Sequence, residues 1–116
     1  MVYSVTESFP PRETYSLSDQ IRRVVVSIPS NITEGVARQT EKEFVNYLHI
    51  ARGSLSELDT QLKLAKRLGY LEEETWKILD AQMERIDEMI SGLIRHQSQK
   101  DGERKRGEAV IALLVP

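Results

Sequence analysis

Basic side chains are the residues of this sequence whose types best suit a binding chemistry, because a phosphate-binding surface needs several positive charges on one face. Five of them form the candidate patch: Arg22, Arg23, Arg38, Lys42 and Arg52. If an oligomer gathers these groups on one face, they would contact the phosphates of an RNA. The alternative is that they are solvated or paired with Glu34, Glu57 and Asp59, and so stabilise the fold.

A second set consists of polar residues within or beside the apolar pattern: Asn31, Glu34, Ser54, Glu57 and Gln61. The last three are spaced by three and then four residues, so we expect a polar row beside an apolar one on the same helix. Such a row could line an oligomer interface or a ligand cavity. The interpretation that we favour is structural, in which these groups satisfy one another and fix the register of the helices.

No pattern of residues indicates catalysis or a bound metal. The sequence has 0 Cys, which excludes disulfides and thiolate sites. The two histidines, His49 and His96, stand outside any motif, and the Glu-x-x-His pairs of a di-iron bundle are absent. A Ser hydroxyl needs a positioned base, and the sequence shows no His in a catalytic motif with Ser27 or Ser54. We therefore expect no enzymatic activity, no metal and no cofactor.

Composition narrows the class of protein further. A chain of 116 residues predicts one domain, and its formal net charge of −2 is not that of a protein that coats nucleic acid nonspecifically. No apolar run approaches the ~20 residues of a membrane span. The N-terminus has neither a basic region nor a long apolar stretch, so it does not read as a secretory signal. We expect a soluble, cytoplasmic protein with no membrane contact.

Apolar residues at helical spacing predict the elements that carry these side chains. The first long helix covers about 16–37, with Ser16 and Asp19 as a capping box and a kink or short break near Pro29. The second starts at the Thr40-x-x-Glu43 capping box. Its apolar seam alternates spacings of four and three: Phe44, Leu48, Ala51, Leu55, Leu58, Leu62 and Ala65.

Gly69 is placed to end this second helix, and Glu72, Glu73 and Glu74 open a third that fades after Ile94. The connector is short, so the two helices should pack antiparallel. Residues 97–108 are polar and charged, and residues 109–115 are wholly apolar. The apolar tail could dock onto an open groove or be an unfolded end. We therefore divide the chain into a helical bundle domain, 1–96, and a charged linker with a short apolar tail, 97–116.

Several ordered motifs resemble the family of four-helix bundle proteins named after the 23S ribosomal RNA intervening sequence. They are Phe9-Pro10, Tyr15-x-Leu17, Gln20-x-Arg22-Arg23, the Ser-x-x-x-Asn-Ile-x-Glu-Gly stretch from Ser27 to Gly35, and the Ala-x-Gly-Ser-x-x-Glu-Leu stretch from Ala51 to Leu58. The matching stretches that contain these motifs span residues 9–71, and helical similarity continues to about Ile94. The resemblance implies an all-α, antiparallel up-down bundle of the four-helix type.

The resemblance also implies a ring-like homo-oligomer, with a homopentamer known for relatives, and no catalytic activity. Some relatives are encoded in bacterial ribosomal RNA genes, and the similar accessory variability protein of diversity-generating retroelements partners a reverse transcriptase and its RNA. We therefore expect a non-enzymatic, self-associating scaffold in a ribonucleoprotein context. The alternative is a protein-only adaptor that binds a partner protein through exposed bundle surface.

This sequence departs from the family in two ways. Relatives usually have a long first helix before the Phe-Pro turn, whereas here about eight residues precede it. We expect that helix to be largely missing, or the start to be placed too far downstream, so that the core is exposed or covered by a partner or by residues 109–115. The second departure is charge, because the retroelement accessory protein is strongly basic and this chain is mildly acidic.

Overall fold

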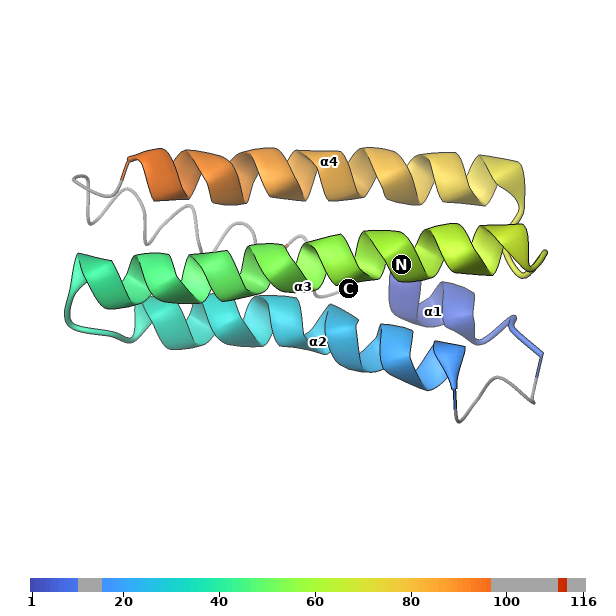
Figure 1. Ribbon diagram of the computed structural model, residues 1–116, viewed down its shortest axis with the longest axis horizontal. Coiled ribbons are helices and arrows are strands. Elements are labelled where there is room, and N and C mark those ends of the chain that lie inside the picture. The colour runs from blue at the N-terminus through green and yellow to red at the C-terminus, as the bar shows by residue number, and fades with distance from the viewer. Residues whose placement is uncertain (11–15, 97–110, 113–116) are drawn as a thin grey trace.

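The structure is a computed structural model that describes residues 1–10, 16–96, 111 and 112, and the regular structure of these residues is helical. Its four named helices are α1 (Val2–Thr6), α2 (Leu17–Val36), α3 (Glu41–Arg67) and α4 (Glu73–Arg95). The long helices lie side by side with α3 between α2 and α4, and the chain reverses direction between successive ones (Figure 1). The predicted all-α bundle is confirmed. The predicted linker and tail, 97–116, lie outside the described residues except for 111 and 112.

The apolar seam of α3 forms the centre of the core. All seven predicted seam residues are buried, with at most 5% of any side chain exposed. Local signals set the ends of the helix as predicted. The Thr40 side chain accepts a hydrogen bond from the Glu43 N–H at 3.2 Å. Gly69 adopts φ +80°, and the Tyr70 N–H donates to the Ala65 carbonyl at 2.9 Å, which closes the last turn.

Helix α2 continues through Pro29, so the helix is not broken there. Pro29 has no N–H to donate to the preceding turn. Side chains around it donate to neighbouring carbonyls instead: the Ser30 hydroxyl to Val26 at 2.8 Å and the Asn31 amide to Ser27 at 2.7 Å. The predicted capping box is wrong in one detail, because Ser16 is the N-cap residue but its side chain makes no capping hydrogen bond.

A glycine lets α2 and α3 approach closely at the end where the chain turns. Gly35 is buried, and a Cβ atom added there would lie 2.8 Å from the Cβ of Tyr47 and 3.0 Å from Cδ1 of Phe44. Distances that short do not occur between real side chains, so any larger residue would push the two helices apart.

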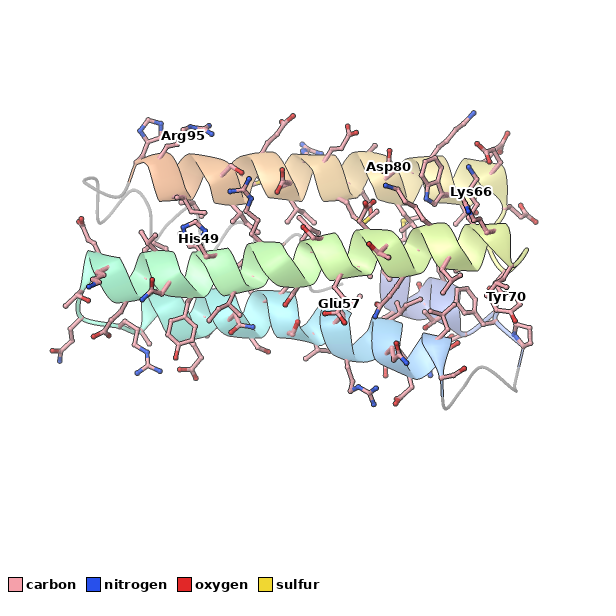
Figure 2. The ribbon with its side chains drawn as sticks, viewed as in Figure 1. His49, Glu57, Lys66, Tyr70, Asp80 and Arg95 are labelled. Carbon is pink, nitrogen blue, oxygen red and sulfur yellow. The ribbon has the colours of Figure 1, made fainter. Side chains whose placement is uncertain are left out.

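The opposite end of the bundle joins α3 to α4. Lys66 points from α3 toward α4 (Figure 2), and its ammonium donates to the Glu73 carboxylate at 2.9 Å. This hydrogen bond lowers the pKa of Glu73 below its usual value. The Lys66 ammonium also lies 3.9 Å from the centre of the Trp76 ring, a cation–π contact. No described helix is long and apolar enough to cross a membrane.

Replacing Leu58 with Ala should destabilise the protein by about 2–5 kcal/mol, because Leu58 is 3% exposed and belongs to the α3 seam. Urea unfolding followed by circular dichroism measures the change. The control is Ile78→Ala on α4, where the side chain is 50% exposed and a change within about 0.5 kcal/mol is expected. Equal stability of the two variants would contradict the assignment of the seam.

Candidate functional site

Arg22, the first of the five candidate basic residues, is used to hold α1. Its Nε donates to the Thr6 hydroxyl at 2.8 Å, and its guanidinium lies 5.1 Å from the centre of the Tyr3 ring. Thr6 is 2% exposed, and its hydroxyl donates in turn to the Tyr3 carbonyl at 2.6 Å. Arg22 therefore fastens a helix of five residues, which is too short to be stable alone.

Arg23 and Arg52 form exposed ion pairs. Arg23 pairs with Asp19 one turn earlier on α2, and its side chain is 67% exposed. The Nε of Arg52 lies 3.5 Å from the Asp87 carboxylate of α4. Both pairs are near the surface, where such contacts stabilise a fold by about 0–1 kcal/mol. These two arginines could exchange their carboxylates for phosphates at low cost.

Arg38 and Lys42 lie at the connection between α2 and α3. The Arg38 guanidinium donates to the Glu34 carboxylate at 3.0 Å and to the Tyr47 hydroxyl at 2.8 Å, and it stacks 5.0 Å from the centre of the Tyr47 ring. The pairing with Glu34 is the structural alternative considered from the sequence. Lys42 is exposed in the first turn of α3.

The structure distributes the five basic residues over three places rather than bringing them together. Arg22 and Arg23 lie in the first half of α2, and Arg38 and Lys42 lie beyond its end. Sixteen residues separate Arg22 from Arg38, which is about 24 Å along a helix axis. Arg52 is in the middle of α3 and faces α4. A single chain therefore offers no compact cluster of these charges.

The polar row of α3 runs from a buried to an exposed position. Gln61 is 8% exposed, and its amide N–H lies 3.5 Å from the Glu57 carboxylate. Glu57 is exposed (Figure 2), and Ser54 is partly buried. The Oε1 atom of Gln61 has no hydrogen-bond partner among the described residues. Gln61 and Glu57 are the pair of this set that the structure brings into contact.

Asn31 and Glu34, the α2 members of the polar set, form hydrogen bonds with residues four positions away in the sequence. Asn31 donates to the Ser27 carbonyl beside Pro29, and Glu34 accepts from Arg38. Neither partner belongs to the polar set, so the interpretation that these residues satisfy one another and fix the register of the helices stays a prediction for Asn31 and Glu34.

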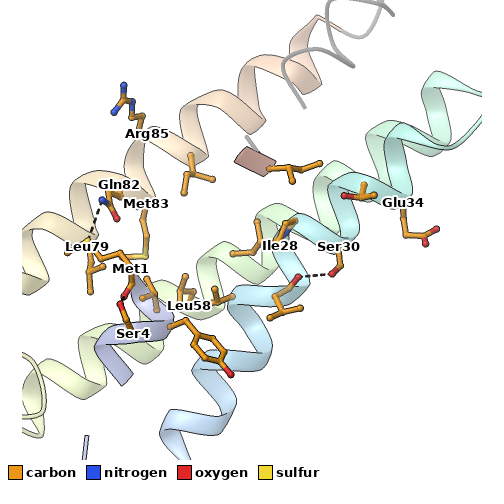
Figure 3. A pocket seen from close by; sticks show the side chains of 18 residues that line it. Met1, Ser4, Ile28, Ser30, Glu34, Leu58, Leu79, Gln82, Met83 and Arg85 are labelled. Carbon is orange, nitrogen blue, oxygen red and sulfur yellow. Dashed lines mark hydrogen bonds between the residues drawn. The ribbon is translucent and has the colours of Figure 1, made fainter. Parts of the chain in front are cut away.

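A large apolar groove lies between α2 and α4, with α3 as its floor. It has a volume of about 910 Å³, near the upper end of the roughly 300–1,000 Å³ typical of ligand pockets. Figure 3 shows Ile28 of α2, Leu58 of α3 and Leu79 and Met83 of α4 around it, with Met1 and Ser4 of α1 entering from one side. We call this space the α2–α4 groove.

The short first helix predicts a core that is exposed, or covered by a partner or by residues 109–115, but the sequence does not predict which side chains line the groove. Val26 on α2, Tyr3 on α1 and Met1 just before α1 all line the groove, and they are 54%, 46% and 44% exposed. A five-residue α1 covers about 7 Å, whereas the 20 residues of α2 extend about 30 Å. This difference in length is the signal on which the prediction of an exposed core depends.

A second apolar surface lies on the side of α3 that faces away from the core. We call it the α3 outer stripe: Ile50, Gly53, Glu57, Leu64 and Leu68. Ile50, Glu57 and Leu64 are spaced by seven residues and share one face. The three apolar side chains are 51%, 47% and 51% exposed. A Cβ added to Gly53 would meet no atom within 4 Å, so the backbone there is open to a neighbour.

Among the described residues, no group of three or more His, Cys, Asp or Glu side chains is arranged to hold a metal ion. The Asp59 carboxylate, 2.9 Å from the Lys63 ammonium, raises the pKa of Lys63 above its usual value. His49 and His96 are exposed. The Ser27 hydroxyl donates a hydrogen bond to the Val24 carbonyl, so this bond does not connect it to a basic side chain.

Replacing Arg22 with Ala should release α1, because the change removes the hydrogen bond to Thr6 and the contact with Tyr3. We expect faster amide hydrogen exchange in residues 2–6 and unchanged exchange in α3. The control is Arg23→Ala, which removes only an exposed ion pair and should leave both regions unchanged. Full protection of residues 2–6 in the Arg22 variant would show that other contacts hold α1.

Comparison with known families adds one finding to this geometry. The family described as 23S rRNA-intervening sequence protein matches residues 1–92. The match covers α1, α2 and α3 and ends near the end of α4, so residues 97–116 lie beyond it. No curated protein matches the chain.

Proposed function

The chain belongs to the 23S rRNA-intervening sequence protein family, and from this premise we propose that it is a non-enzymatic, self-associating helical scaffold. The observation that carries the proposal is the α3 outer stripe, which exposes three large apolar side chains on one face of the central helix. Large apolar side chains that are exposed along one face of a helix can pack against a neighbouring molecule. Open space at Gly53 allows a neighbouring backbone to approach.

The free energy that burial of the α3 outer stripe can contribute limits the kind of assembly that the stripe supports. Full burial of a Leu or Ile contributes about 1.5–3 kcal/mol, so each half-exposed side chain of the stripe has roughly half of that left to gain. Association costs about 4–15 kcal/mol, which three such side chains do not offset alone. A closed ring gives each subunit two interfaces and so multiplies the contacts. This reasoning supports a ring-like homo-oligomer, and the family resemblance suggests a pentamer.

Glu57 gives this surface its specificity in the proposal. It is an exposed carboxylate in the middle of an apolar stripe, beside the buried Gln61. A partner surface must present a donor at that position, because an unpaired buried carboxylate is costly. The polar row and the apolar stripe together would therefore select one neighbour and one register.

The role of RNA is the part of the proposal that depends on assembly. Four of the five candidate basic residues are engaged within the chain, and they are distributed along the bundle. The protein contacts therefore have stronger support than phosphate contacts. An assembled ring could still place Arg23 and Arg52 of several copies on one face, which is how a ribonucleoprotein context would arise. A protein-only adaptor is the second candidate, favoured by the open α2–α4 groove.

We expect the double variant Ile50→Glu, Leu64→Glu to be monomeric under conditions where the natural sequence is oligomeric, because each change buries a carboxylate in the proposed interface. Sedimentation velocity measures the mass, and circular dichroism checks that helix content is unchanged. The matched control is Ile78→Glu, the same type of change at a 50% exposed residue of α4. A natural chain that stays monomeric over the whole concentration range would refute self-association.

A structured ribosomal RNA fragment tests the ribonucleoprotein version. Because the arginines are paired within the chain, we expect only nonspecific affinity, with a Kd of about 10⁻⁴–10⁻⁶ M at physiological salt. The double variant Arg23→Ala, Arg52→Ala should bind slightly more weakly, because it has lost two positive charges, and should still show only nonspecific affinity. Fluorescence anisotropy over a salt series gives both values. A Kd below this range, with a steep salt dependence for the natural sequence and a smaller one for the double variant, would establish an RNA site.

A further inference from the structure

We propose that the α2–α4 groove is a docking site for a short apolar segment, and that its occupant is residues 109–115 of the same chain. The observation that carries this inference is Ile111, which lines the groove together with α1, α2 and α4. Ile111 is partly buried and packs against the hydrophobic core. It reaches that position although it lies 16 residues after the end of α4 at Arg95.

The chemistry of the segment matches that of the groove. Residues 109–115 read Ala-Val-Ile-Ala-Leu-Leu-Val and contain no polar side chain. The groove presents apolar side chains from three helices: Val26, Ile28, Leu58, Leu79, Met83 and Ile86. With Ile111 in place, Val26 is 54% exposed and the other five are at most 7% exposed. Leaving the apolar segment in water is unfavourable, so it gains by packing against this wall. The volume of about 910 Å³ admits several side chains rather than one.

The geometry of the chain favours its own segment over one from elsewhere. Ile86, a groove residue on α4, precedes Arg95 by nine residues, which is about 13 Å along the helix. The 14 residues from 97 to 110 can span up to about 46 Å when extended, so reach does not limit docking. A covalent link also gives the segment an effective concentration in the millimolar range. The inference does not depend on the proposed self-association.

The α1 helix leaves room for this occupant. Met1 to Ser4 line the groove, and the Gln82 amide of α4 lies 3.6 Å from the Met1 sulfur, so α1 bridges toward α4. The five residues of α1 cover about 7 Å, whereas the part of α2 that lines the groove, from Val25 to Glu34, extends about 14 Å. The remaining length is where a second short segment fits. A partner protein could bind in the α2–α4 groove only after residues 109–115 have left it.

A spin label on the full chain tests the proposal. The sequence has no Cys, so Ala112→Cys provides a single attachment point for a nitroxide, next to Ile111 and on an exposed residue. We expect the label to broaden the methyl NMR signals of Val26 and Ile86 in the groove. The signal of Leu68 on the α3 outer stripe should stay sharp. No broadening in the groove, or equal broadening at Leu68, would overturn the proposal.

Two further samples identify the occupant. In the first, isotope-labelled protein without nitroxide is mixed with unlabelled protein that carries it. Broadening in the groove of the labelled molecules would mean that a second copy supplies the segment, which would also overturn the proposal. In the second, Ile111→Asp is added to the spin-labelled chain and should abolish the broadening. The matched control is Gln99→Asp, which introduces the same carboxylate into the polar stretch and should leave the broadening unchanged.

The assay uses the variant Ile50→Glu, Leu64→Glu as a second background. If the groove signals are still broadened in this variant, residues 109–115 dock in the monomer. The test of docking is then independent of the test of self-association. Circular dichroism of each variant confirms that the helices are intact.

Discussion

Burial of the α3 seam against both neighbours is the interaction on which the rest of the structure depends. A single helix supplies the central surface for α2 on one side and for α4 on the other (Figure 1). Gly35 brings α2 so close that the backbone of one helix meets the side chains of the next. Because α3 separates α2 from α4, the two outer helices leave a space between them, and that space is the α2–α4 groove. The exposed back of the same helix is the α3 outer stripe.

This arrangement explains why so many charged side chains have structural partners. The outer helices are held by contacts at their edges, such as Arg52 with Asp87 and Lys66 with Glu73. Arg38 closes the turn between α2 and α3 by reaching Glu34 and Tyr47. Each contact is weak at an exposed surface, but each sits where two elements meet. The charged side chains therefore stabilise the places where two elements of the bundle meet.

The sequence specified the long helices well because their signals are local. The alternating seam from Phe44 to Ala65, the Thr40 cap and the Gly69 stop each depend on residues within a few positions. The candidate site was harder to predict, because its properties depend on contacts between distant parts of the chain. Arg22 meets Thr6 across 16 residues, and Ile111 meets helices that end before residue 96. The sequence predicted a kink or a short break near Pro29, and α2 continues through this residue without a break.

The two ends of the described chain share one location, because Met1 and Ile111 both line the α2–α4 groove. Proteins whose termini lie close together tolerate circular permutation. A short linker from Ala112 to Met1 would join the two ends of the described chain, and new ends could open at the turn around Gly69. The position of Met1 also affects how the protein is handled in the laboratory. An affinity tag attached to Met1 stands at the groove, whereas a tag inserted between α3 and α4 leaves it clear.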